Sequence, residues 1–148
     1  AKAQCFYEAM QPEFKKYIDN VIINAKALAD TLNEEGFKIV SNTTDNHLLM
    51  VDVNSSVNIT GKDAEEILEK INITCNKNMI PYDKLPANIT SGIRLGSAAM
   101  TTRGLTKEDF IEIGKIISLA LKNIDTIDNL RKRVKNITGK YPLYKEIN

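Results

Sequence analysis

Apolar side chains recur at alternating steps of three and four over residues 8–32, which is the period of an amphipathic helix. The positions that form this stripe are Phe14, Ile18, Val21, Ala25, Leu28 and Leu32. Pro12 suits the first turn of such a helix and separates it from any helical turn before it. Gly36 supplies a stop signal. The stripe therefore predicts a helix that turns one face toward the core.

Short apolar stretches bounded by polar residues predict β-strands over residues 37–40, 47–53, 73–75 and 89–96. The second of these, HLLMVDV, is apolar on both faces over most of its length, as in a buried strand. Residues 41–46 are polar and predict a turn, and residues 54–59 predict a loop. After Asn76, the prolines Pro81 and Pro86 bracket a segment with no helical or strand period. We expect a loop there, presented by the scaffold.

Two further helices begin at capping signals, because Thr60 is followed by Asp63 and Thr106 by Asp109. The apolar face of the first contains Ala64, Ile67, Leu68 and Ile71, and that of the second contains Phe110, Ile113, Ile117 and Leu121. Gly114 inside the second helix costs roughly 1 kcal/mol relative to alanine. We therefore expect a close contact between helices at Gly114.

A last helix is predicted before Gly139 and Pro142, and Tyr141 and Tyr144 are expected to pack back on the body. Its inward positions are Ile124, Ile127, Leu130, Val134 and Ile137. The order of elements predicts an α+β fold, in which helices cover one face of a small, mainly antiparallel sheet. We expect one domain over residues 1–148, with residues 1–35 as a long helix that leads into it.

Composition narrows the range of functions. The 148 residues are 43% hydrophobic and 26% charged, with a net charge of +1, so strong steering toward nucleic acid or membranes is not expected. No apolar run approaches the roughly 20 residues that span a bilayer. Cys5 and Cys75 are far apart and have no ligand partners, which argues against a metal site. His47 is the only histidine, and without an acid–base partner we interpret it as a turn residue that hydrogen-bonds locally.

Arg94 is the main candidate for binding chemistry. It lies between Gly92 and Gly96 within a short apolar run, and arginine is seldom left among apolar neighbours without a partner. Its planar fork binds a carboxylate with two parallel hydrogen bonds. The residues leave two interpretations open. Arg94 binds the carboxylate of a ligand, or it pairs with an internal Asp or Glu.

Four motifs in order resemble the C-terminal part of the serine hydroxymethyltransferase family, whose members are pyridoxal phosphate (PLP) enzymes that exchange a one-carbon unit between serine and tetrahydrofolate. They are TDNHL at residues 44–48, NKN-x-x-P at residues 76–81, TSGIR-x-G at residues 90–96 and TTRG at residues 101–104. The resemblance extends over essentially the whole chain. It departs from the family at Asn42 and Thr43, where two glycines are usual.

The resemblance implies roles for particular residues. Arg94 would hold the carboxylate of serine or glycine, and Asn78 would contact the pteridine ring of the folate. The folate-contacting loop, usually Ser-Pro-Phe in the family, aligns with Pro86, Ala87 and Asn88, so these contacts are the least secure. Arg103 has no ligand role and is expected to form a structural ion pair.

The family's lysine that binds PLP lies in a motif similar to TTHKT, which is absent from this sequence. The chain thus resembles a detached C-terminal small domain, and its first residue is not methionine, which fits a chain cut from a longer one. The resemblance implies a missing N-terminal large domain, a homodimeric cytoplasmic parent enzyme, and no turnover by this piece alone.

Two other classes remain open. The chain could be the small domain of another fold-type-I PLP enzyme, although Asn78 argues against this. It could also be a non-catalytic RNA-binding module that uses the basic residues near its end. These are Arg131, Lys132, Arg133 and Lys135.

Overall fold

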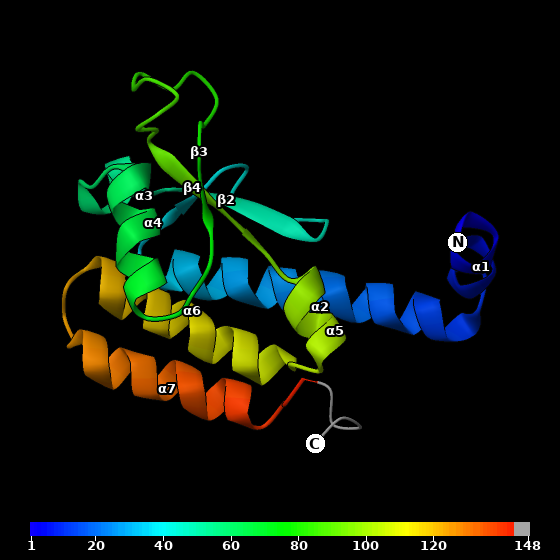
Figure 1. The fold of residues 1–148 in the computed structure, drawn as a ribbon. Helices are drawn as coiled ribbons and strands as arrows, with labels where there is room; N and C mark the ends of the chain where they lie inside the picture. Colours follow the sequence, from blue (N-terminus) through cyan, green and yellow to red (C-terminus); the bar gives the residue numbers. More distant parts are fainter. Residues whose placement is uncertain (144–148) are drawn as a thin grey trace.

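The computed structural model describes residues 1–143, which form seven helices and four strands (Figure 1). In chain order the elements are α1 (Lys2–Ala9), α2 (Pro12–Glu34), β1 (Lys38–Ile39), β2 (Leu48–Asp52), α3 (Val53–Val57), α4 (Gly61–Lys70), β3 (Asn76–Asn78), β4 (Gly92–Gly96), α5 (Ala98–Arg103), α6 (Lys107–Leu121) and α7 (Ile127–Gly139). The architecture is α+β, as the sequence predicts.

The four strands form one antiparallel sheet in the order β1-β2-β4-β3. Alternation along the strands gives the sheet two different faces. The inner face is buried and consists of Ile39, Leu49, Val51, Ile93 and Leu95. The opposite face, called the open face below, is half-buried or exposed and carries Leu48, Met50, Asn76, Asn78 and Arg94. In Figure 1, α2, α6 and α7 lie below the sheet, and the core fills the space between them.

The longest helix, α2, packs along α6, and the contact is close at Gly114. A Cβ atom at Gly114 would lie 2.8 Å from Cγ2 of Thr31, which is closer than real side chains approach. The predicted helix contact is therefore confirmed. Leu32 and Phe110 are fully buried in the same layer, and each such side chain stabilises the fold by roughly 1.5–3 kcal/mol.

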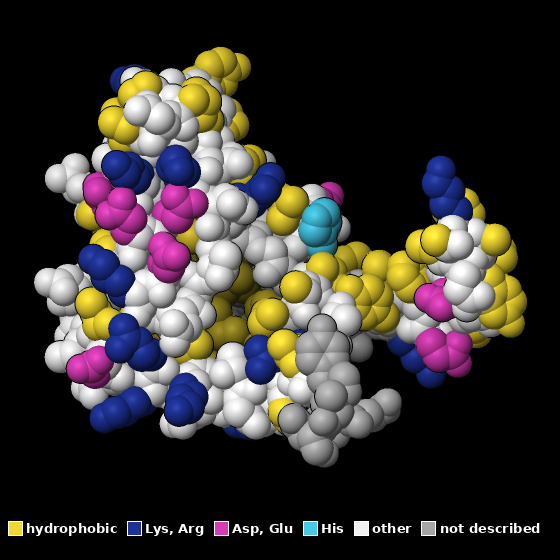
Figure 2. Space-filling model, in the orientation of Figure 1, with side chains coloured by type: hydrophobic (Ala, Val, Ile, Leu, Met, Phe, Trp, Pro, Cys, Tyr) yellow, Lys and Arg dark blue, Asp and Glu magenta, His cyan; other side chains and the backbone are white. Residues whose placement is uncertain are grey.

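The N-terminal part of the chain forms two helices where the sequence predicts one long helix. Pro12 is the first residue of α2, so α1 ends before it. No residue of α1 is buried, and Figure 2 shows this helix standing away from the body with apolar side chains on its surface. The large exposed apolar residues of this region are Phe6, Tyr7, Met10, Phe14, Ile18 and Ile23.

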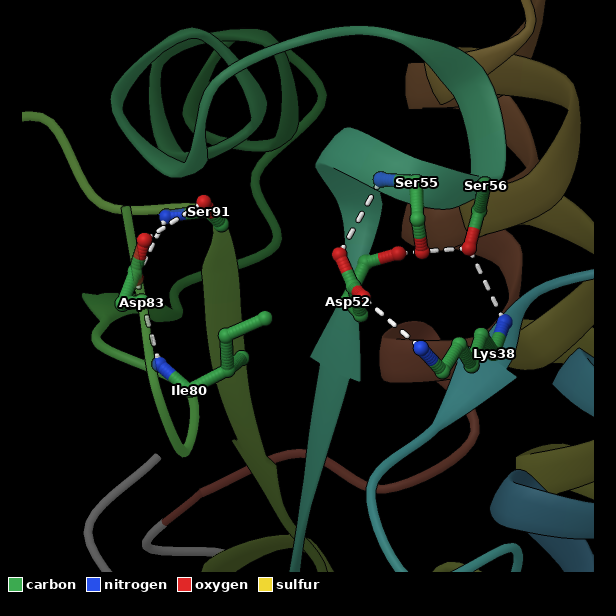
Figure 3. Close-up of polar contacts among 7 residues, drawn as sticks. All are labelled: Lys38, Asp52, Ser55, Ser56, Ile80, Asp83 and Ser91. Carbon is green, nitrogen blue, oxygen red and sulfur yellow. Dashed lines mark hydrogen bonds and ion pairs between the residues drawn. The ribbon is translucent and has the colours of Figure 1, made fainter. Parts of the chain in front are cut away.

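The prediction of a loop over residues 54–59 is wrong in part, because Val53–Val57 form the short helix α3. The side chain of Asp52 caps it by accepting a hydrogen bond from the Ser55 N–H at 3.0 Å. Figure 3 shows the same carboxylate beside the Lys38 ammonium, 3.4 Å away, so that Asp52 joins β1, β2 and α3.

The predicted strand over residues 73–75 is also wrong, because pairing with β4 begins only at Asn76. Asn72 has a positive φ of 64° and the N–H of Ile73 returns to the carbonyl of Leu68, which closes the end of α4. The predicted strand over residues 89–96 begins later, at Gly92, because Thr90 has a left-handed backbone with φ of 60°.

The turn predicted over residues 41–46 is present, and its left-handed residues are Ser41 and Asn42. Helix α5 was not predicted. Ile124 and Ile127 are exposed and not inward, because α7 begins only at Ile127. The three remaining inward positions of that helix, Leu130, Val134 and Ile137, are buried as expected.

The C-terminal aromatic residues have different outcomes. Tyr141 packs back as predicted, and its hydroxyl donates a hydrogen bond to Oδ2 of Asp109 at 2.7 Å. Tyr144 lies outside the described residues.

Candidate functional site

The strand order brings Arg94 and Asn78 together on the open face. Arg94 is at the centre of β4, opposite Met50 on β2 and Asn76 on β3. Its side chain is exposed, and within residues 1–143 it forms no salt bridge. The internal pairing with Asp or Glu that the sequence left open is thus not formed in the described part of the chain. The guanidinium is free to meet a ligand.

Asn78 lies on the neighbouring strand, opposite Gly92 and therefore diagonal to Arg94. Diagonal neighbours across an antiparallel pair are roughly 7–8 Å apart. The amide of Asn78 donates to Sδ of Met50 at 3.2 Å and to the carbonyl of Met79 at 2.7 Å, which fixes it on the open face. Asn78 and Arg94 are therefore close enough to contact two ligands that lie side by side on the open face.

Gly92 has a steric reason to be glycine. A Cβ atom there would lie 2.6 Å from Cγ2 of Ile80 and 2.9 Å from the carbonyl oxygen of Val51. Ile80 thus folds back over β4 directly after Asn78. Gly96 has no such requirement, since its nearest neighbour, the carbonyl oxygen of His47, would be at an ordinary 3.5 Å.

The segment between the two strands, residues 79–91, is an irregular loop that projects at the top of Figure 1. Its tip contains Pro86, Ala87 and Asn88, all exposed. The tip is a tight turn, because the carbonyl of Pro86 accepts hydrogen bonds from the N–H groups of Ile89 and Thr90, both at 2.9 Å. The three residues expected to contact folate therefore lie in the loop that joins the strand of Asn78 to the strand of Arg94.

Asp83 organises this loop (Figure 3), and no pattern in the sequence points to it. Its carboxylate accepts four hydrogen bonds: from the Ser91 hydroxyl at 2.6 Å, and from the N–H groups of Leu85, Ser91 and Ile80 at 2.9, 2.9 and 3.2 Å. Partial burial raises the pKa of the Asp83 carboxyl, but the hydrogen bonds outweigh this and lower the pKa to about 2. The group is ionised at neutral pH.

A shallow hollow of about 360 Å³ borders Arg94 on the open face, and His47 and Cys75 line it as well. Burial raises the pKa of the Cys75 thiol to about 12, with a smaller contribution from the charge of Glu65, so this thiol is not a nucleophile at neutral pH. The backbone carbonyl of His47 accepts a hydrogen bond from the N–H of Ser97 at 2.9 Å, which ties the start of β2 to the residue after β4. This contact is distant in the sequence and involves the backbone alone, so the local role expected for His47 stays a prediction.

A family model for serine hydroxymethyltransferase matches residues 1–117 of this sequence. The chain belongs to the serine hydroxymethyltransferase family. The match includes β3, β4 and the loop between them, so Asn78 and Arg94 lie within it. Membership implies a PLP-dependent transferase as the parent protein, in a family that in general uses PLP and folate.

Residues 1–143 of this chain do not fit the cofactor. PLP requires a lysine held within a pocket. Among these described residues, no lysine lines the hollow beside Arg94, and none lines a second, mainly apolar hollow of about 320 Å³ between β4, α6 and α7. Two of the less exposed lysines, Lys77 and Lys122, are committed to Glu65 and Glu35. No step of the chemistry is therefore assigned to a lysine of this chain.

Arg103, in the TTRG motif of the family, forms no ion pair with a residue in the described range 1–143. Its Nε donates to the carbonyl of Tyr141 at 2.6 Å and its Nη2 to that of Thr138 at 3.1 Å. These are carbonyls at the end of α7, where a helix leaves acceptors without internal partners. Within residues 1–143, the guanidinium therefore caps the end of a helix and does not meet a carboxylate.

The basic residues of α7 are partly occupied. Arg131 donates to the carbonyl of Lys70 at 2.7 Å and to Asp128, and Arg133 donates to Glu112 at 2.6 Å. Two of the four cations of the candidate RNA-binding face therefore have intramolecular partners.

Residues 1–143 contain neither a metal site nor a membrane-spanning helix. Within residues 1–143, no group of three or more His, Cys, Asp and Glu side chains is placed to hold a metal ion. None of the helices in the same range is both long and apolar enough to cross a bilayer.

Proposed function

We propose that this chain supplies the substrate-carboxylate and folate contacts of a serine hydroxymethyltransferase, which interconverts serine and glycine with tetrahydrofolate as the one-carbon carrier. The observation that carries the proposal is the placement of Arg94 and Asn78 on adjacent strands of the open face. The family match supplies the chemical class.

In this proposal Arg94 binds the carboxylate of serine or glycine. A bidentate contact fixes the amino acid in position and direction, so that the bonds at its Cα are oriented for cleavage. The exposed side chain on a buried strand suits this role, because β4 is held rigidly by β2 and β3 while the guanidinium remains available.

Asn78 contacts the pteridine ring of the folate, since an amide both donates and accepts hydrogen bonds and matches a pterin edge. Pro86, Ala87 and Asn88 add contacts from the loop tip. This tip differs from the usual family residues, so backbone groups and the Asn88 amide take the place of the usual side chains.

PLP would be held outside these residues, by a large domain that covers the open face. The chain alone would then not turn serine into glycine. The parent enzyme would be a cytoplasmic homodimer that associates largely through the large domain.

The test is the variant Arg94→Lys in the PLP-bound enzyme that contains this chain. Lysine keeps the charge but loses the planar fork, so kcat/KM for serine is expected to fall at least about a hundredfold, or roughly 3 kcal/mol of transition-state stabilisation. Serinol, which replaces the carboxylate by an alcohol, should lose less than threefold, because it never used the fork.

Arg131→Lys is the matched control. It is the same substitution at an exposed arginine of α7, a helix on the opposite side of the sheet from the open face. It should leave serine turnover within twofold. A variant Arg94→Lys that retains the wild-type discrimination between serine and serinol would contradict the proposal.

A further inference from the structure

The loop of residues 79–91 is irregular in backbone, yet both of its ends are tied to one carboxylate. Asp83 accepts from the N–H of Ile80, two residues after Asn78, and from the N–H and hydroxyl of Ser91, three residues before Arg94 (Figure 3). One side chain thus joins the strand that carries Asn78 to the strand that carries Arg94.

The N-terminus of α4 holds the same loop from the other side. The N–H groups of Gly61 and Lys62 donate to the carbonyls of Thr90 and Ile89, at 2.9 and 3.0 Å. These are N–H groups of the first turn, which have no partner within their own helix. A Cβ atom on Gly61 would lie 2.1 Å from Oγ1 of Thr90, so only glycine allows this approach.

Thr90 is held in a conformation that β-branched residues rarely adopt, with φ of 60°. It is 2% exposed, and its hydroxyl donates to the carbonyl of Gly92 at 3.0 Å. Such a conformation persists only where the surrounding contacts determine it, and it is typical of functional loops. The base of the loop is therefore fixed before any ligand arrives.

We infer that Asp83 is a positioning residue for the folate contacts: it holds the tip, Pro86–Asn88, in the binding conformation relative to Asn78. This inference rests on the proposed function. A loop that is already ordered does not lose conformational entropy on binding. If only a fraction of the loops were in the binding conformation, the apparent dissociation constant would rise by the inverse of that fraction.

The variant Asp83→Asn isolates the effect, because it keeps the size of the side chain. Each carboxylate oxygen of Asp83 accepts from at least one backbone N–H: Oδ1 from Leu85, Oδ2 from Ile80 and Ser91. Whichever oxygen becomes the NH₂ group therefore faces a donor, and at least one N–H loses its partner.

In the PLP-bound enzyme that contains this chain, Asp83→Asn is expected to raise KM for tetrahydrofolate about tenfold. The value of kcat at saturating folate and KM for serine should each change less than twofold. A merely structural role would not produce this separation. Trypsin should also cleave after the exposed Lys84 at least about five times faster in the native variant, since an opened loop reaches the protease more often.

Asp109→Asn is the control. Asp109, at the start of α6, is likewise a carboxylate that accepts several hydrogen bonds, among them those from Thr106 and Tyr141. It makes none with the loop of residues 79–91. Its variant should lose stability but keep both KM values and the rate of cleavage at Lys84.

Two results would overturn the inference, and they differ. A wild-type enzyme that uses folate, together with an Asp83→Asn variant whose KM for folate stays within twofold, would remove the role of Asp83 alone. A wild-type enzyme without folate-dependent turnover would overturn the proposed function, and the role of Asp83 with it.

Discussion

At the scale of single residues, the open face combines a free cation with fixed surroundings. Arg94 is exposed, but the residues opposite it on both neighbouring strands are set by the register of the sheet. Asn78 is held by Met50 and by its own neighbour, Met79. Binding groups placed on strands are positioned more accurately than groups on free loops. The proposed site would therefore require little rearrangement of this chain when a substrate binds.

The ionisation of Asp83 makes a testable link between pH and stability. Its folded pKa of about 2 is below the ordinary 3.8, so its stabilising effect is fully present above the ordinary value. The effect is lost as pH falls from about 4 to 2, through the folded pKa. The difference in melting temperature between the wild-type chain and Asp83→Asn should be constant above pH 4, by this linkage, and should shrink toward zero near pH 2.

A difference that stays constant over that whole range would contradict the assignment. The carboxyl ¹³C resonance of Asp83, followed by NMR, gives an independent check, because it reports the pKa of this group directly.

At the scale of elements, α2 and α6 form the layer on which the sheet rests. Their close approach depends on Gly114, which accommodates the side chain of Thr31. Thr31 is itself stiff, because it is β-branched and its hydroxyl donates to the carbonyl of Ala27 at 2.8 Å. The helix pair thus has little freedom to admit a larger residue.

Gly114→Ala is expected to lower the free energy of unfolding by about 1–3 kcal/mol, since overpacking at Thr31 outweighs the gain in helix propensity. Gly139→Ala is the matched control. It is also in a helix, but nothing lies within 4 Å of its added Cβ, so it should be neutral or stabilise by up to about 1 kcal/mol. Urea unfolding of both variants provides the measurement, and a stabilising Gly114→Ala would contradict the packing described here.

Local signals predicted the longer helices α2, α4, α6 and α7, whereas the short helices and the strand limits depend on contacts that the sequence does not record. The capping boxes at Thr60 and Thr106 are both formed, because they involve residues only three apart. Strand β3 was missed because Asn76–Asn78 are polar and become a strand only by pairing with β4. The late start of β4 and the left-handed Thr90 follow from contacts with α4, which no local pattern records.

In the candidate site, too, some residues could be predicted from the sequence and others only from the folded structure. Arg94 and Asn78 were identified from the sequence, the first partly from its chemistry and both from a family resemblance. Asp83 was missed because its partners are backbone N–H groups, whose positions depend on the folded loop. For Arg103 the sequence analysis predicts an ion pair, because its observed carbonyl partners, Thr138 in α7 and Tyr141 just after it, leave no mark in the sequence.

At the scale of the whole molecule, the two faces of the sheet have different tasks. The inner face and the helices beneath it form the core, and the open face presents Arg94 and Asn78. In the described part of the chain, residues 1–143, no lysine lines either of the hollows beside β4. We therefore propose that this chain contributes substrate contacts to an enzyme whose PLP lysine lies elsewhere.

The most direct test is the visible absorbance of the purified 148-residue chain after incubation with PLP and removal of the excess, without a reductant. If the PLP lysine lies outside this chain, the chain alone should retain no PLP absorbance and show no response to glycine. PLP absorbance should be retained when a PLP-binding large domain is added. A stoichiometric band on the chain alone that shifts with glycine would contradict the account, because a cofactor lysine would then lie within these residues.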